Sequence, residues 1–225
     1  MFTVLEVYNN IPYDPDIKAD FGYSCFIKEP GVLFDSGAHG DILLYNLNRL
    51  GISVDQINYF VLSHDHWDHN GGIGALLDEN PNIISYCPPD TSEETRMILS
   101  RGAGCFSTHG WLELSPGVFL TGPVEGSYAE KKITEQSIVL ENEKGLFLIT
   151  GCSHPHISKI LGYVKNKGDV FGVVGGFHDV NEEDVRSLEG LEYLSPSHCT
   201  TAIEAIAEEF GENFVRSGAG FIHRI

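Results

Sequence analysis

The stretch Ser63-His64-Asp65-His66-Trp67-Asp68-His69, followed by Asn70-Gly71-Gly72, decides the fold of this chain. It places three histidines and two aspartates within the six residues from His64 to His69. It directly follows Ile57–Leu62, a short apolar run typical of a buried strand. A solvated, histidine-rich loop is the alternative interpretation. The buried strand before the cluster and the glycine pair after it favour a metal site instead.

The spacing of these side chains is typical of metal ligands. His64 and His66 lie two residues apart in an extended segment, so both rings project to the same side and can reach one metal ion. Asp68 and His69 follow where the chain turns into a helix, and they can face a second ion. Imidazole nitrogen and carboxylate oxygen suit Zn²⁺, and also Fe or Mn.

Further histidines follow other expected strands. Any one of them alone would more often be structural, but active sites in α/β folds commonly gather at strand ends. Together they favour a single converging site. The junctions are Gly145–Thr150 with Gly151-Cys152-Ser153-His154-Pro155-His156, Val170–Val174 with Gly175-Gly176-Phe177-His178-Asp179, and Tyr193-Leu194-Ser195-Pro196-Ser197 with His198-Cys199-Thr200.

The rest of the chain alternates short apolar runs with helical periodicity, which predicts an α/β sandwich. No linker or internal repeat interrupts it, so we expect one domain over residues 1–225. Further strands are expected at Val4–Tyr8, Ser24–Lys28, Gly31–Asp35, Val118–Thr121, Ser137–Glu141, Glu192–Ser195, Phe214–Arg216 and Gly220–Arg224. Helices are expected at Asp41–Leu50, Gly71–Glu79, Ile157–Lys167, Glu182–Glu189 and Thr201–Phe210.

Composition narrows the classes of partner. The 14 basic and 32 acidic side chains give a net charge of −18, which repels phosphate backbones, so we expect a small-molecule substrate and no nucleic acid. No apolar run is long enough to span a membrane, and the N-terminus lacks a signal peptide, so no membrane association and a cytoplasmic location are expected. The five cysteines are irregularly spaced without a CxxC pair, which argues against a disulfide framework. The oligomeric state is not indicated.

These motifs carry a family resemblance. The pattern His64-x-His66-x-Asp68-His69 after an apolar strand resembles the signature of the metallo-β-lactamase superfamily, and Asp35 in Leu33-Phe34-Asp35-Ser36-Gly37 is similar to its early strand-end aspartate. One branch is resembled more closely, that of the dihydropterin-(ribofuranosyl)aminobenzene-phosphate synthase-like proteins. The segments similar to that branch are Val61-Leu62-Ser63-His64, Asn70-Gly71-Gly72, Thr150-Gly151-Cys152-Ser153-His154, Gly175-Gly176-Phe177-His178 and His198-Cys199-Thr200.

The resemblance implies an αββα sandwich of the metallo-β-lactamase type with two divalent metal ions, expected to be Zn²⁺, with Fe or Mn as alternatives. By similarity, His64 and His66 hold the first ion, and the second is held by Asp68, His69 and His198. The first ion needs a third ligand, for which His154 is our choice and His109 its rival.

The sequence departs from the superfamily at one place. Gly151-Cys152 stands where a bridging aspartate normally follows a glycine, so either the Cys152 thiolate ligates metal or Cys152 is a small buried residue and water alone bridges the ions. His178 is expected to face the substrate or to neighbour the ligands. Asp35 is expected to orient a ligand rather than to bind metal itself.

Three functions follow as hypotheses. The leading one is hydrolysis of a small ester, lactone, thioester or phosphoester by metal-activated hydroxide, with Asp68 both ligating metal and orienting the water. The second is a dihydropterin-pathway synthase, for which Trp67, Trp111, Phe177 and Phe106 offer aromatic walls. The third is a non-catalytic metal- or ligand-binding protein, against which the intact ligand motif argues.

Overall fold

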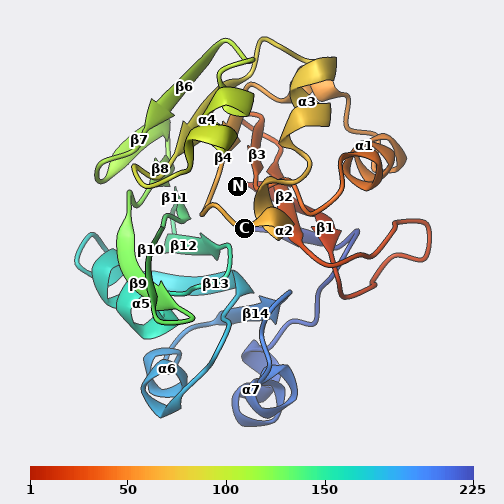
Figure 1. Cartoon of the computed structure of the whole chain (residues 1–225). Coiled ribbons are helices and arrows are strands. Elements are labelled where there is room, and N and C mark those ends of the chain that lie inside the picture. The colour runs from red at the N-terminus through yellow and green to blue at the C-terminus, as the bar shows by residue number, and fades with distance from the viewer. The chain divides into compact units, whose positions relative to one another are not determined.

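Two large β-sheets organise the chain, and each belongs to one of two compact units (Figure 1). The computed structural model describes residues 1–225. Unit 1 comprises Met1–His109 together with Gly218–Ile225, and unit 2 comprises Gly110–Ser217.

Unit 1 contains a seven-stranded mixed sheet in the order β15-β1-β2-β3-β4-β5-β6. Strands β3 to β6 are parallel, whereas β15, β1, β2 and β3 pair antiparallel. The strands are β1 (Thr3–Asn9), β2 (Tyr23–Ile27), β3 (Val32–Phe34), β4 (Tyr59–Val61), β5 (Ile84–Cys87), β6 (Gly104–Ser107) and β15 (Ile222–Arg224). The helices are α1 (Gly40–Arg49), α2 (Trp67–Asn70), α3 (Ile73–Glu79) and α4 (Glu93–Leu99), with a 3-10 turn η1 at Val54–Gln56.

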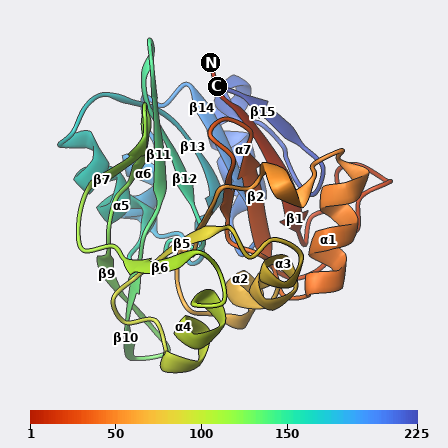
Figure 2. The same ribbon diagram turned by 90° about the horizontal axis from the view of Figure 1, so that it is seen from above.

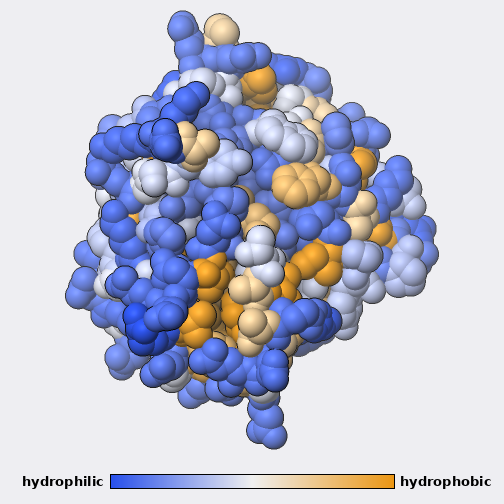
Figure 3. Space-filling view, turned by 60° about the horizontal axis from the view of Figure 1, so that its bottom comes forward, coloured by the Kyte–Doolittle hydropathy of each residue, from blue (hydrophilic) through white to orange (hydrophobic).

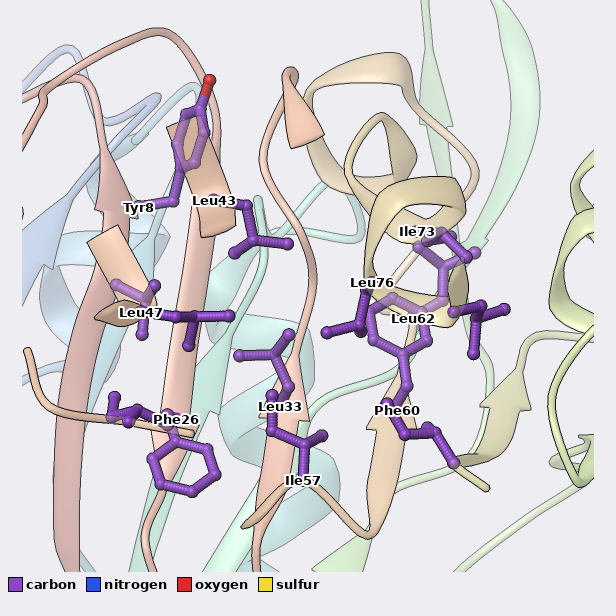
Figure 4. Packing of buried hydrophobic residues seen from close by; sticks show 14 of the residues in the cluster. Tyr8, Phe26, Leu33, Leu43, Leu47, Ile57, Phe60, Leu62, Ile73 and Leu76 are labelled. Carbon is purple, nitrogen blue, oxygen red and sulfur yellow. The ribbon is translucent and has the colours of Figure 1, made fainter. Parts of the chain in front are cut away.

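The core of unit 1 forms between the sheet and the helices α1 and α3, which lie side by side (Figure 2). Leu43 and Leu47 of α1 and Leu76 of α3 belong to the same buried cluster as Phe60 at the sheet (Figure 4). Each fully buried leucine contributes on the order of 1.5–3 kcal/mol. Gly40 permits the close approach of the two helices, because a Cβ there would lie only 2.5 Å from the Cβ of Ala75.

Unit 2 contains a six-stranded sheet in the order β14-β13-β12-β11-β8-β7 and a separate two-stranded sheet, β10-β9. Strands β12, β13 and β14 are parallel, so their carboxyl ends lie at one edge of the sheet. The strands are β7 (Leu112–Ser115), β8 (Val118–Leu120), β9 (Val124–Tyr128), β10 (Lys131–Glu135), β11 (Ile138–Asn142), β12 (Gly145–Thr150), β13 (Val170–Gly176) and β14 (Tyr193–Ser197). The helices are α5 (Ile157–Lys165), α6 (Glu182–Ser187) and α7 (Ile203–Phe210), with a 3-10 turn η2 at Gly211–Asn213.

Most of the expected elements are present, with three kinds of difference. The expected strand Phe214–Arg216 is wrong, because only Phe214 forms an isolated bridge, to Leu194. The expected helix Gly71–Glu79 is α3, which begins two residues later at Ile73, and the short helix α2 before it ends at Asn70, so that Gly71 and Gly72 cap the two helices. Six further strands and helices had no counterpart among the expected ones, namely β5, α4, β6, β7, β9 and β10, and the 3-10 turns η1 and η2 had none either.

The surface agrees with the acidic composition. The face drawn in Figure 3 is mainly hydrophilic, with apolar side chains in smaller groups. None of the helices combines the length and the hydropathy that crossing a bilayer requires.

Candidate metal centre

The histidine-rich motif begins where β4 ends. After β4 the chain bends at Ser63, His64 and Asp65 and reaches His66, which is extended, with φ −105° and ψ 148°, and precedes the first residue of α2. His64 Nε2 and His66 Nδ1 lie 3.1 Å apart. Two nitrogens bound to one tetrahedral Zn²⁺ at about 2.0–2.1 Å are roughly 3.3 Å apart, so this pair of donors fits one ion.

A second pair of donors follows in α2. Asp68 Oδ2 lies 3.5 Å from His69 Nε2, again close to the separation of two ligands on one ion. Asp68 is 7% exposed and His69 is completely buried, so neither is a solvated surface group. The rings of His64 and His69 lie 4.2 Å apart, which keeps both pairs of donors in one small region of unit 1.

Asp35 organises the histidines of the motif. Its Oδ2 accepts hydrogen bonds from Ser63 Oγ and His69 Nδ1, each at 2.7 Å, and its Oδ1 accepts one from the Ser63 backbone N–H, also at 2.7 Å. Because the Ser63 hydroxyl gives its hydrogen to Asp35, it accepts from His64 Nδ1 at 2.8 Å. One buried carboxylate therefore fixes the Nδ1–H tautomer of both His64 and His69, which directs their Nε2 lone pairs toward the other donors.

Asp65 lies inside the motif but has a different task. Its carboxylate accepts hydrogen bonds from the Ser92 backbone N–H, from Thr95 Oγ1 and from Asn70 Nδ2. Burial opposes its ionisation, yet the hydrogen bonds from Ser92 and Thr95 hold the pKa of Asp65 below its ordinary value. Asp65 thus ties the motif to the start of α4.

In unit 2, Glu135 holds the loop that follows β12. This completely buried carboxylate accepts hydrogen bonds from the backbone N–H groups of Cys152, Ser153 and His154, at 2.8, 2.8 and 3.0 Å. Three amides on one carboxylate fix the path of the loop, and so the positions of the Cys152 and His154 side chains. No sequence motif pointed to Glu135.

The loops after β12, β13 and β14 approach one another closely. Gly176 permits this approach, because a Cβ there would lie 2.7 Å from Cys199 Sγ and 2.4 Å from the Gly151 carbonyl oxygen. The possible ligand atoms of Cys152 and His198 lie within 4.8 Å of each other. Cys152 is 3% exposed and His198 is 4% exposed. This pair offers one sulfur and one nitrogen donor, a set that suits Zn²⁺.

Cys199 and His178 influence each other's ionisation beside these donors. The hydrogen bond with Cys199 raises the pKa of His178, and burial acts in the opposite direction. Burial also opposes ionisation of Cys199, but hydrogen bonds with Cys152 and His178 hold the pKa of its thiol well below the ordinary value. The sequence placed Cys199 in the motif His198-Cys199-Thr200 but indicated no role for it.

An aromatic group adjoins two histidines of unit 2. The Tyr128 ring, on the β9–β10 hairpin, lies 4.9 Å from the His154 ring and 5.5 Å from the His178 ring. The rings of His154 and His178 are themselves 4.6 Å apart. Tyr128 is 45% exposed, so one part of its surface remains open to a ligand. No sequence motif pointed to Tyr128.

The remaining histidines have other places. His156 Nδ1 lies 3.0 Å from Asp184 Oδ2, and Asp184 also accepts from the Ser158 backbone N–H, so His156 joins the start of α5 to α6. His109, the rival third ligand, is exposed, whereas His154 is 6% exposed. Each unit therefore carries part of the expected ligand set: His64, His66, Asp68 and His69 in unit 1, and Cys152, His154 and His198 in unit 2.

Comparison with known families agrees with the motif. The family model described as the metallo-beta-lactamase superfamily matches residues 19–198. The chain belongs to the metallo-β-lactamase superfamily. The expected fold class, the α/β fold of the metallo-β-lactamase type, is confirmed.

Individual relatives confirm the narrower resemblance. The chain is 28% identical to the 7,8-dihydropterin-6-methyl-4-(β-D-ribofuranosyl)-aminobenzene-5′-phosphate synthase of Methanocaldococcus jannaschii, over 99% of this chain and 95% of that protein. Tm1679, a metal-dependent hydrolase of the β-lactamase superfamily, has a TM-score of 0.82 at 23% identity and covers 100% of this chain and 99% of its own. The metallo-β-lactamase fold protein YhfI of Bacillus subtilis has a TM-score of 0.73 at 14% identity, and the match covers 99% of this chain and 98% of YhfI. The two solved structures establish the fold.

Proposed function

We propose that the donors of the two units form one centre for two divalent metal ions. The first ion would be held by His64, His66 and His154. The second would be held by Asp68, His69, His198 and the Cys152 thiolate. Membership of the superfamily supports this assignment, as do the donor separations of 3.1 and 3.5 Å within the motif. Zn²⁺ suits this mixture of nitrogen, oxygen and sulfur donors, with Fe and Mn as alternatives.

We propose further that the enzyme is a hydrolase acting on a small ester, lactone, thioester or phosphoester. The observation that carries this proposal is the Asp35 network, which holds His64 and His69 in the tautomer that metal binding requires. When bound, the metal ions supply Lewis acidity, which lowers the pKa of water to about 7 and stabilises an oxyanion. The Asp68 carboxylate orients the attacking water and accepts its proton.

We propose that His178 contacts the substrate. Its side chain is 27% exposed, so a substrate oxygen can reach the imidazole ring beside His154 and Tyr128. His178 is therefore proposed as a second catalytic residue, binding the carbonyl or phosphoryl group beside the metal centre.

The exposed aromatic rings favour a small organic substrate. Phe21 and Trp67 stack with their ring centroids 5.7 Å apart and are 47% and 59% exposed. Trp67 is part of the ligand motif itself, so a ring of the substrate could pack against this pair. With a net charge of −18, we propose a small-molecule substrate, with neither nucleic acid nor a membrane as partner.

The second candidate is a dihydropterin-pathway synthase. It is favoured by the similarity to the Methanocaldococcus jannaschii synthase, which extends over 99% of this chain. The exposed ring of Trp67, next to His66 and Asp68, also suits a planar pterin.

The deciding experiment compares the wild-type protein with the double variant His64→Ala/His66→Ala. Metal content is measured by mass spectrometry, turnover on a panel of esters, lactones, thioesters and phosphodiesters, and dihydropterin binding by titration calorimetry. The matched control is His39→Ala, which removes an exposed histidine of unit 1 outside the motif. Loss of metal and of turnover in the double variant alone supports the hydrolase.

Three other outcomes would argue against the hydrolase. Undiminished turnover in a metal-free double variant would refute the metal-dependent mechanism. Tight dihydropterin binding without ester hydrolysis by the wild-type protein would favour the synthase. Metal binding with neither activity nor pterin binding would favour a non-catalytic protein.

A further inference from the structure

Two cysteine sulfur atoms lie close together in unit 1, outside the histidine motif. Cys87 ends β5, Cys105 lies in the neighbouring parallel strand β6, and their Sγ atoms are 4.0 Å apart. The register pairs Cys87 with Ser107 and Ser85 with Cys105, so both thiols point to the same face of the sheet. Cys87 is completely buried, whereas Cys105 is partly exposed. One thiol can therefore meet a small reagent, and the other lies behind it.

Arg96 supplies positive charge beside this pair. Its guanidinium donates hydrogen bonds to Ser107 Oγ at 2.9 Å, to the Pro88 and Pro89 carbonyl oxygens at 2.8 and 3.0 Å, and to the Thr91 carbonyl oxygen at 3.0 Å. All four acceptors are uncharged, so no carboxylate among them neutralises the guanidinium. Its charge therefore acts on the neighbouring sulfur atoms.

We propose that Cys105 is a covalent modification site for small oxidants such as hydrogen peroxide, with Cys87 as the thiol that resolves the product into a disulfide. The asymmetry of the pair supports these roles. The hydrogen bond with Cys87 and the charge of Arg96 outweigh burial and lower the pKa of Cys105 to about 7. For Cys87, the same hydrogen bond and burial both raise the pKa. About half of Cys105 is thus thiolate at neutral pH, against roughly 3% of an ordinary thiol with a pKa near 8.5.

The reaction balances with peroxide as the two-electron oxidant. The Cys105 thiolate attacks one peroxide oxygen, the O–O bond breaks, and hydroxide leaves, which produces a sulfenic acid. The Cys87 sulfur then attacks the Cys105 sulfur. The thiol proton of Cys87 and the sulfenic hydroxyl leave together as water, and the S–S bond forms.

The sheet can accommodate this bond. The sulfur atoms must move from 4.0 Å to the S–S distance of about 2.05 Å. Strand β6 is the edge of its sheet and pairs only with β5, so it can shift without breaking a second row of backbone hydrogen bonds.

The test treats the full-length protein with hydrogen peroxide near pH 7, blocks the remaining thiols by alkylation and identifies the products by peptide mass spectrometry. The expected product joins the Cys87 and Cys105 peptides. Cys87→Ser is expected to leave a Cys105 sulfenic acid that dimedone traps, and Cys105→Ser is expected to leave Cys87 unmodified. Cys25, which is completely buried and whose pKa is raised by burial, is the internal control.

A second measurement needs no variant. The rate of Cys105 alkylation by iodoacetamide in the wild-type protein is expected to rise with pH through a midpoint near 7. A midpoint near 8.5, or alkylation no faster than that of Cys25, would overturn the proposal. A peroxide-treated protein in which Cys105 stays reduced while Cys152 or Cys199 is oxidised would overturn it as well.

Discussion

The substitution Asp35→Asn probes how the ligand histidines are organised. The Asp35 carboxylate accepts three hydrogen bonds, one on Oδ1 and two on Oδ2, from Ser63 and His69. An asparagine presents an oxygen to only one of these sides, so its NH₂ group must face at least one buried donor. Each unsatisfied buried donor costs about 1–3 kcal/mol, and we expect the metal-free variant to unfold more easily by roughly that amount.

The larger effect is expected on metal binding. If the NH₂ group of the introduced asparagine takes the place of Oδ2, His69 can pair with it only by accepting at Nδ1, and its proton then moves to Nε2, the atom that faces Asp68. A protonated Nε2 cannot bind a metal ion. In the other orientation the carboxylate charge that supports the imidazole is lost. Removing such a partner of a ligand histidine typically weakens metal binding by about 10–100-fold.

The assay combines Zn²⁺ titration calorimetry, denaturant unfolding of the metal-free protein and nitrogen-15 NMR of the histidine tautomers. Asp65→Asn is the matched control. It also removes a carboxylate with three hydrogen bonds inside the motif, but its partners belong to Ser92, Thr95 and Asn70. We expect the control to lose stability and keep its Zn²⁺ affinity. Equal Zn²⁺ affinity in Asp35→Asn and wild type, with His69 still protonated on Nδ1, would refute the assigned role.

Three further outcomes are expected. Glu135→Gln leaves at least one of its loop amides unpaired, which should destabilise the fold by about 1–3 kcal/mol in denaturant unfolding and weaken Zn²⁺ binding. Unchanged stability and unchanged Zn²⁺ affinity would contradict the role of Glu135 in holding the loop after β12. Tyr128→Leu removes the ring beside His154 and His178, so KM should rise several-fold while kcat stays nearly constant, whereas Tyr128→Phe should retain the wild-type KM. A chelator should abolish turnover and lower the melting temperature, and added Zn²⁺ should restore both; full activity after chelation would exclude a metal role.

The sequence predicted the central strands and the motif for a clear physical reason. Strands such as β4 and β12 are buried, and their apolar runs end abruptly in polar residues that have a chemical task. The hairpin β9–β10 lacked that signal because most of its side chains are at least partly exposed and polar. Helix α4 was missed although the sequence holds a signal for its start: Ser92 is an N-cap residue, and its side chain accepts a hydrogen bond from the Thr95 backbone N–H.

The parts of the site that sequence reasoning missed depend on contacts between distant residues. Glu135 precedes the amides that it binds by 17 to 19 residues, and only the path of the chain through β11 and β12 brings them together. Tyr128 likewise reaches His154 and His178 through the position of its hairpin. Asp35 was predicted to orient a ligand, but only the structure shows that it holds two histidines, His69 directly and His64 through Ser63.

Backbone strain offers a last link between the fold and the proposed chemistry. Asp35, Ser153, His178 and His198 have φ values of 57°, 64°, 39° and 51°, a region that residues other than glycine rarely adopt and that costs on the order of 1–3 kcal/mol for each residue. Hydrogen bonds offset this strain at Asp35 and Ser153. The Asp35 carboxylate accepts three, and Ser153 Oγ donates one to the Gly176 carbonyl oxygen. A fold selected for stability alone would place glycine at such turns. Because side chains with hydrogen-bonding or ligand atoms stand there instead, the strain is best explained as the cost of holding donors ready for metal and substrate.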